Sequence, residues 1–427
     1  MNGIIIFVLL IALLVTGMPI SIALGLTVLA FLFTLTTMPV EIVSQRLFTG
    51  LDQFAIMAIP FFILAGGFLT HGGVAKRMIR FANALVGHLT GGLALSGVLA
   101  CALFAAVSGS SPATVVAIGS MVIPAMVQQG YPKRFGVGVI GTAGALGILI
   151  PPSIVMIIYG VATNTSIGKL FIAGIVPGIL LAALLMFVTW VVAKRKGYPT
   201  QPRASLKEVL LAFRECVWGL LLIFVVIGGI YGGAFTPTEA AAMSAVYAFV
   251  VAVYIYKDLR LRDVPRVLID SANMSAMLLY IITNAILFSF LLTAENIPQD
   301  IALWVAAKGM EPWMFLIVLN ILLLIAGNFM EPSSITLLLA PILFPVAMTL
   351  GIDPVHLGIV FTINMEIGMI TPPVGLNLYV ASGIAKMGLT EVTLACAPWI
   401  LVMIAFLLLV TYVPIIAMWL PNLMYAK

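Results

Sequence analysis

Four short breaks interrupt the apolar stretches of this 427-residue chain, and they form two matching pairs. The first pair is Ser-Gly-Ser-Ser-Pro at residues 108–112 and Gly-Ile-Leu-Ile-Pro-Pro at 147–152. The second pair is Gly-Asn-Phe-Met-Glu-Pro at 327–332 and Gly-Met-Ile-Thr-Pro-Pro at 368–373. The first prolines of the two breaks are 39 residues apart in the first pair and 40 residues apart in the second. The second pair therefore repeats the first.

These breaks have the chemistry of an ion-binding site. Proline removes a backbone donor and clashes with the preceding helical turn, so each break leaves main-chain groups without a helical partner. Freed carbonyl and hydroxyl oxygens can coordinate a hard cation such as Na⁺, while the N-terminus of a half-helix favours an anion. Ordinary proline kinks in membrane helices are the alternative. Matching breaks in two halves of a chain favour a transporter binding site instead.

The composition indicates a polytopic membrane protein. The chain is 63% hydrophobic and 8% charged, whereas a soluble domain has about 45–50% apolar and about 25% charged residues. The net charge of +5 is not interpreted as affinity for nucleic acid, because the basic residues gather between apolar runs. The three cysteines and three histidines do not cluster, and no Gly-x-x-x-x-Gly-Lys motif occurs. A metalloenzyme and an ATPase are therefore disfavoured.

The apolar runs divide the chain into two halves with the same order of elements. A bilayer is crossed by about 20 residues. We expect a first half at residues 1–193, a cytoplasmic linker at 194–217 and a second half at 218–427. Each half is predicted to contain five membrane spans and one run that turns back, near 89–126 and near 313–350.

The charge distribution predicts that the two halves are inverted copies. If each returning run is a re-entrant helical hairpin, each half crosses the membrane an odd number of times. With the N-terminus outside, 16 of the 20 Lys and Arg residues lie in inner loops; Arg46, Lys169, Lys308 and Lys427 do not. The positive-inside rule supports this orientation. The first hairpin is then expected on the cytoplasmic side and the second on the outside, in an all-α fold. Residues 74–88 and 298–308 are predicted to be amphipathic segments at the membrane surface.

Motifs along essentially the whole chain carry a family resemblance. They lie at residues 108–114, 118–124, 147–153, 165–171, 236–241 and 364–375. Together they resemble the large membrane subunit of TRAP (tripartite ATP-independent periplasmic) transporters. The resemblance implies an elevator-type ion-transporter fold, in which a transport domain of hairpins and broken helices moves against a scaffold. It also implies a multi-pass protein of the bacterial inner membrane, surrounded by membrane lipid.

The resemblance implies a function and partners as well. Such carriers import a small organic anion, for example a C4-dicarboxylate, sialic acid or a similar carboxylate, by symport with Na⁺. They work with a small four-helix membrane subunit and a periplasmic substrate-binding protein. A stand-alone sodium/carboxylate symporter of related fold is the alternative. An intramembrane enzyme acting on lipid-linked substrates is a third hypothesis, disfavoured because no catalytic carboxylate or histidine pair is evident.

Motif positions in the resemblance imply which residues bind the ions. One sodium site would use Ser108, Ser110, Gly147, Ile150 and Pro152, mostly through carbonyl groups. The mirrored site would use Gly327, Gly368, Thr371 and Val374. The second hairpin tip has Asn328 and Glu331 where the first has serines, so the ligands from this tip are left open. Expected substrate contacts are Ser111, Asn164, Ser166, Glu331 and Asn377.

Three acidic residues within apolar runs have alternative roles. An ionisable residue at membrane depth is a functional candidate, so Glu331 is predicted to bind a substrate hydroxyl or amine, or to tune the affinity for sodium. Alternatively, Glu331 caps the half-helix that begins at Pro332. For Glu366 a cap or brace on its broken helix is favoured over a functional role, and Glu239 could equally orient the turn at residues 236–237.

Overall fold

The computed structural model describes residues 2–36, 39 and 41–425, and no β-strand occurs among them. Lys427, counted above among the outer basic residues, lies outside this part of the chain. The first half forms α1 (Asn2–Val15), α2 (Ile20–Leu35), α3 (Glu41–Leu51), α4 (Ala58–His71), α5 (Val74–Val86), α6 (Gly92–Ser108), α7 (Ser111–Gln128), α8 (Lys133–Ala143), the 3-10 turn η2 (Gly144–Ile148), α9 (Ile154–Thr163) and α10 (Ile167–Lys196).

The second half repeats this order of helices. It forms α11 (Leu206–Ile223), α12 (Gly229–Tyr231), α13 (Pro237–Val250), α14 (Val264–Ala294), α15 (Ile297–Ala307), α16 (Pro312–Gly327), α17 (Pro332–Thr349), α18 (Pro354–Gly368), α19 (Leu376–Ala385), α20 (Leu389–Tyr412) and α21 (Ile415–Tyr425). Eight helical stretches within the described residues are long and apolar enough to cross a membrane.

Two helices were not predicted from the sequence, and helices extend into both ends of the predicted linker, since α10 ends at Lys196 and α11 begins at Leu206. The short helices α3 and α21 were missed because each is only 11 residues long and adjoins a longer apolar run. The basic residues 194–196 extend α10 beyond the start of the predicted linker, and Gly197 ends that helix in the left-handed conformation, with φ of 66°. A glycine at this position is a common helix terminator.

The helices α6 and α7 form a hairpin, because both ends of the pair reach the same short segment after α10. At the start of α6, the Gly91 N–H donates to the Pro199 carbonyl oxygen at 3.3 Å. At the end of α7, the Tyr131 hydroxyl donates to the same oxygen at 3.0 Å. The Gln201 side chain also donates to Gln129 at 3.2 Å. The tip of this hairpin is the break at Gly109 and Ser110.

The pair α16–α17 is closed in the same way by the end of α20. The Tyr412 hydroxyl donates, at 3.4 Å, to the carbonyl oxygen of Trp313 at the start of α16. His356 lies in the first turn of α18, directly after α17, and its Nε2 is 3.0 Å from the Val410 carbonyl oxygen. The base of the hairpin is therefore held by the segment just after α10 in the first half and by the last turn of α20 in the second.

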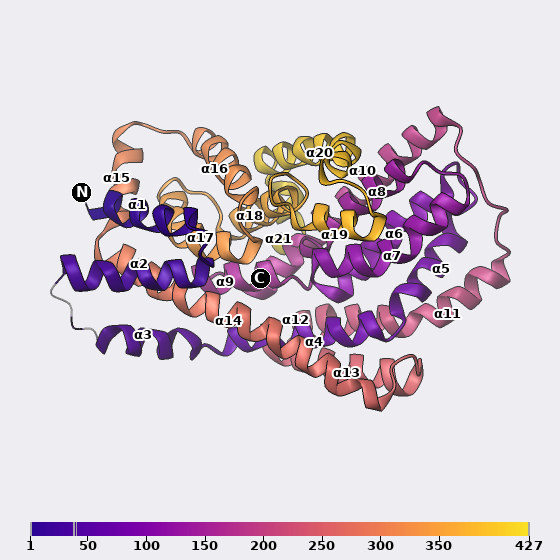
Figure 1. The fold of residues 1–427 in the computed structure, drawn as a ribbon, viewed down its shortest axis with the longest axis horizontal. Helices are drawn as coiled ribbons and strands as arrows, with labels where there is room; N and C mark the ends of the chain where they lie inside the picture. Colours follow the sequence, from indigo (N-terminus) through magenta and orange to yellow (C-terminus); the bar gives the residue numbers. More distant parts are fainter. Residues whose placement is uncertain (1, 37–38, 40, 426–427) are drawn as a thin grey trace.

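The two halves also pack on each other reciprocally. The second part of each broken helix packs on the other half's hairpin, so α9 contacts α17 and α19 contacts α7. Likewise α2 packs on α14 and α4 on α13. Figure 1 shows the two hairpins toward opposite ends of the molecule, with α9, α18 and α19 between them. This arrangement brings all four breaks toward the centre.

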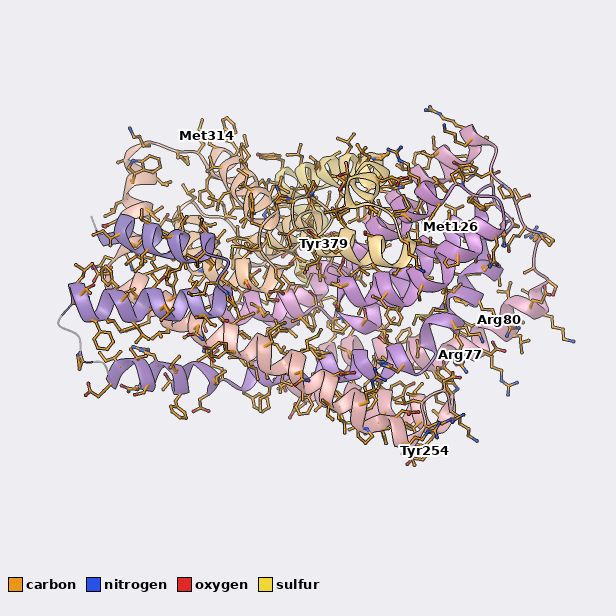
Figure 2. The ribbon with its side chains drawn as sticks, in the orientation of Figure 1. Arg77, Arg80, Met126, Tyr254, Met314 and Tyr379 are labelled. Atoms are coloured by element: carbon orange, nitrogen blue, oxygen red, sulfur yellow. The ribbon has the colours of Figure 1, made fainter. Side chains whose placement is uncertain are left out.

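Ion pairs tie the amphipathic helix α5 to the second half. Arg77 pairs with Asp258 and also lies over the ring of Tyr256, 3.8 Å from its centroid. Arg80 pairs with Glu215 of α11 at 2.5 Å. Figure 2 shows Arg77 and Arg80 at the end of the molecule that also carries Tyr254, away from Met314 of the second hairpin.

Candidate functional site

The tip of the first hairpin is shaped by its serines and one glycine. Ser108 ends α6, and Gly109 follows with φ of 62°, a conformation that glycine adopts without steric cost. The Ser108 hydroxyl lies 3.1 Å from the Thr114 hydroxyl. The Ser110 carbonyl oxygen accepts from the Thr114 backbone at 3.1 Å and from its hydroxyl at 2.8 Å. Hydroxyl and carbonyl oxygens are therefore concentrated within one helical turn.

The first broken helix packs directly on this tip through its backbone. A methyl group added at Gly147 would lie 2.6 Å from the Ser110 carbonyl oxygen, and one added at Gly109 would lie 2.8 Å from that of Pro152. The structure thus brings together Ser108, Ser110, Gly147 and Pro152, four of the residues that the resemblance implies for the first sodium site. The Ile150 side chain points into an apolar cavity beside Gly178, so only its main chain is available to an ion.

The second hairpin meets the second broken helix in the equivalent way. A methyl group added at Gly327 would lie 3.0 Å from the Cα atom of Gly368. The Val374 N–H donates to the Asn328 carbonyl oxygen at 2.9 Å. The Thr371 hydroxyl donates to the Ile367 carbonyl oxygen at 2.6 Å and keeps its lone pairs free to accept or coordinate. The four residues predicted for the second sodium site are therefore neighbours, and Asn328 is the residue through which the hairpin tip contacts them.

Glu331 caps the half-helix α17, which was the alternative to a direct contact with substrate. One carboxylate oxygen accepts from the Ser333 hydroxyl at 2.6 Å and its backbone N–H at 3.2 Å. The other accepts from the backbone and hydroxyl of Ser334 at 3.3 and 3.2 Å. A carboxylate at a helix N-terminus is stabilised by these donors and by the helix dipole. The substrate contact of Glu331 stays a prediction.

A small cavity separates the two hairpin tips. Its volume is about 160 Å³. The first tip contributes residues 109–112 to its wall and the second contributes residues 331–333, while Met369 and Leu376 flank the second break. Ser111 and Glu331, both predicted substrate contacts, therefore face the same space from opposite hairpins.

Asn377 lies behind this wall and joins the two halves. Its side-chain nitrogen donates to the Ser111 hydroxyl at 2.7 Å, and that hydroxyl donates to the Gly144 carbonyl oxygen at 3.0 Å. The Asn377 backbone N–H donates to the Met369 carbonyl oxygen at 2.9 Å. Its side-chain oxygen is buried and has no hydrogen-bond partner among the described residues. Asn377 thus positions Ser111 relative to both broken helices.

Residues 7–416 match the family described as "Tripartite ATP-independent periplasmic transporter, DctM component". The chain belongs to this family. The C4-dicarboxylate TRAP transporter large permease protein DctM of Rhodobacter capsulatus is 67% identical over 438 residues, which cover 99% of this chain and 100% of that protein. The protein of the same name from Pseudomonas aeruginosa is 57% identical over 383 residues, 90% of each chain. The resemblance seen in the sequence motifs is confirmed.

A solved structure shares the fold at low sequence identity. The YdaH transporter of Alcanivorax borkumensis superimposes with a TM-score of 0.62 and 16% identity, over 90% of this chain and 88% of that one. The family match makes the chain a multi-pass transporter permease, and the superposition shows that it shares its fold with the YdaH transporter. Because the chain belongs to a permease family, the site is interpreted as a transport site.

Two predicted substrate contacts of the TRAP permease lie elsewhere. Asn164 ends α9 with φ of 56°, and the Ser166 hydroxyl accepts from the Lys169 backbone at 3.4 Å. Both line a separate polar cavity of about 480 Å³, whose wall also includes Lys169, Asp353 and part of α21. The structure does not place them on the wall of the cavity between the hairpin tips.

The sequence analysis missed a buried polar chain beside the second site. Asn364 donates to the Asn320 side-chain oxygen at 2.8 Å, and Asn320 donates to the Thr411 hydroxyl at 3.1 Å. This chain links α16, α18 and α20. Amide side chains within apolar runs are the signal that could have identified it, because a buried polar group requires a partner.

Glu366 does not cap or brace its helix as expected. Neither carboxylate oxygen has a hydrogen-bond partner among the described residues, and the side chain is fully buried. Its position within α18 leaves the surrounding backbone groups engaged in helical hydrogen bonds, so they are unavailable to it. Glu239, by contrast, accepts from the Thr236 backbone at 2.8 Å and orients that turn as predicted.

Proposed function

We propose that this TRAP permease imports a C4-dicarboxylate together with Na⁺, and that the cavity between the hairpin tips binds the dicarboxylate. The observation that carries the proposal is the meeting of both hairpin tips and both broken helices around that cavity. The substrate class is supported by two relatives, 67% and 57% identical, that are named C4-dicarboxylate permeases.

The geometry of the tips suits an anion with two carboxylates. The half-helices α7 and α17 begin at Ser111 and Pro332, and both of these residues line the cavity. The positive end of a helix dipole favours a negative group, so the N-terminus of α7 can receive one carboxylate, and at α17 the second carboxylate would replace that of Glu331 as the cap. The Ser111 hydroxyl, held by Asn377, lies on one side and can donate to a carboxylate once its proton turns away from the Gly144 carbonyl oxygen.

Sodium ions at the two predicted sites would supply the remaining positive charge. The first site uses oxygens of Ser108, Ser110 and the first broken helix; the second uses those of residues 327, 368, 371 and 374. A bound Na⁺ orders the hairpin tip and lowers the cost of placing a dianion near Glu331, since opposite charges attract strongly where water is scarce. This coupling makes uptake depend on the sodium gradient.

The proposed movement is that of an elevator with two inverted repeats. The contact of α9 with α17 corresponds to that of α19 with α7, and the contact of α2 with α14 corresponds to that of α13 with α4. These reciprocal contacts support a two-fold relation between the halves. In this mechanism α2, α4, α13 and α14 belong to the scaffold, while the hairpins and broken helices move with the substrate. The permease would lie in the bacterial inner membrane, assisted by a small membrane subunit and a periplasmic binding protein.

Reconstitution into proteoliposomes tests this function. The complex of this permease with its small subunit should accumulate labelled succinate only with substrate-loaded binding protein and an inward sodium gradient. Uptake without the binding protein would favour a stand-alone symporter. Uptake that ignores the sodium gradient would contradict the assignment of the two ion sites.

A further inference from the structure

A second cavity lies beside the first hairpin, between two helices of the proposed scaffold. Its volume is about 360 Å³. One wall is a single face of α4, which includes Ile63, Gly67 and His71. Residues spaced by three or four share a helix face, so this wall is continuous along the helix.

The opposite wall is a single face of α14. It includes Val267, Asp270, Ser271 and Met274, which have the same helical spacing. The two walls approach each other closely at one point, where a methyl group added at Gly67 would lie 2.9 Å from the Ser271 hydroxyl oxygen. We call this space the α4–α14 vestibule.

The vestibule continues into the cavity between the hairpin tips. Ser110, Pro112, Ile154 and Met274 line both spaces. Met274, at this junction, is 49% exposed. A substrate that leaves the tips can therefore pass along the faces of α4 and α14.

The far end of the vestibule lies at the arginine-rich end of the molecule. His71 is the last residue of α4. Gly73, two residues later, lies so close to Asp258 that a methyl group added at Gly73 would be 2.2 Å from the Asp258 carboxylate. Asp258 pairs with Arg77 of α5, which Figure 2 places together with Arg80. The charge distribution predicts that this end faces the cytoplasm.

Asp270 and His71 are the ionisable side chains on the vestibule wall. His71 Nδ1 lies 2.9 Å from the Gly67 carbonyl oxygen, an acceptor, so this nitrogen carries a proton and donates it. Asp270 is exposed and forms no ion pair with another described residue. An unneutralised carboxylate repels a dicarboxylate and attracts a cation.

We propose that the α4–α14 vestibule is the cytoplasmic release route for the dicarboxylate, and that the Asp270 carboxylate disfavours its return. The inference rests on the proposed function. Asp270 acts on the occupancy of the vestibule: a dianion that has left the hairpin tips meets a like charge on the wall and has a short residence time there, which weakens rebinding from the cytoplasm. Sodium ions leaving by the same route are not repelled.

Charged thiol reagents measure the electrostatic effect directly. In the complete transporter carrying Met274→Cys, in inside-out vesicles, the thiol is treated with a trimethylammonium-ethyl or a sulfonato-ethyl methanethiosulfonate. The native Cys101, Cys216 and Cys396 are free and buried, so Met274→Cys is the accessible target. We expect the cationic reagent to react faster, and Asp270→Asn to lower the ratio of the two rates by about 3- to 10-fold.

A matched control and a transport readout complete the test. Asp263→Asn removes a nearby acid of the same helix end that pairs with Arg262 and is not on the vestibule wall, so the ratio should be unchanged. In proteoliposomes loaded with unlabelled succinate, Asp270→Asn should lower the internal concentration that halves uptake of labelled succinate by about 3- to 10-fold.

Three results would decide against the inference or its basis. If Met274→Cys is not modified from the cytoplasmic side, the vestibule is not the release route. If Asp270→Asn and Asp263→Asn give the same rate ratio and the same inhibition by internal succinate, Asp270 does not hinder the return of the dicarboxylate from the cytoplasm. If the thiol reacts as expected but the wild-type complex takes up no succinate, the proposed substrate is wrong while the electrostatic role of Asp270 stands.

Discussion

Replacing Gly147 with alanine tests whether the first sodium site depends on the close approach of two backbones. The added methyl group would lie 2.6 Å from the Ser110 carbonyl oxygen, 0.8 Å less than the 3.4 Å at which ordinary contact begins. It would also lie 2.7 Å from the Ser110 carbonyl carbon and from the Ser111 Cα atom. No flexible side chain can yield at this point, so the hairpin tip itself must move.

The size of the effect follows from that displacement. Forcing an extra methyl group into a well-packed site costs about 1–3 kcal/mol. If this cost falls on the ion-bound arrangement, the half-saturating Na⁺ concentration for uptake rises by about 5- to 150-fold, since 1.4 kcal/mol corresponds to a factor of ten. Gly383→Ala is the matched control, because that helical glycine of α19 has nothing within 4 Å of an added methyl group.

The assay is the sodium dependence of succinate uptake by the reconstituted complex, with thermal unfolding in detergent measured in parallel. We expect Gly147→Ala to require much more sodium, while Gly383→Ala resembles the wild type. Equal sodium dependence of both variants would refute the reasoning, because the backbone contact would then have no part in ion binding. A lower melting temperature with unchanged sodium dependence would assign the contact to stability alone.

Three further changes test other parts of the site. Ser108→Ala combined with Ser110→Ala should raise the half-saturating Na⁺ concentration without preventing membrane insertion, since about 1 kcal/mol of hydroxyl interactions is lost; unchanged sodium dependence would argue against that site. Glu331→Ala should destabilise the second hairpin by about 1 kcal/mol through loss of its cap, and Glu331→Gln should do so less, as measured by melting temperature; equal stability of the two variants would contradict the capping role. Asn364→Leu leaves Asn320 without its donor and should lower stability by about 1–3 kcal/mol, whereas an unchanged melting temperature would show that water replaces it.

Much of the architecture could be predicted because apolar composition and proline are local signals. The pair α16–α17 spans 312–349, within one residue at each end of the run expected near 313–350. The pair α6–α7 spans 92–128, within three residues of the run expected near 89–126. The amphipathic segments appear as α5 and α15. Proline and glycine end the helices at the four breaks through local effects on the backbone, whereas Pro124 and Pro177 lie inside continuous helices.

The roles of individual polar residues were harder to predict, because they depend on which neighbours the fold supplies. Asn377 was expected at the substrate, which stays a prediction, and the structure adds that it holds Ser111 from 266 residues away in the chain. Asn164 and Ser166 follow a broken helix, as expected, yet they face a different cavity. Glu331 was expected to contact the substrate or to cap α17, and in the structure its carboxylate accepts hydrogen bonds from the serines two and three residues later.

The amino-acid sequence alone determined that this chain lies in a membrane, that its two halves repeat, and where its helices break, because hydropathy and helix termination depend on residues near one another in the chain. Only the tertiary structure decided that the breaks meet around one cavity, that a second cavity lined by α4 and α14 adjoins it, and which polar atoms remain without partners. Those features depend on contacts between residues separated by hundreds of positions, and such contacts form only when the two halves pack together.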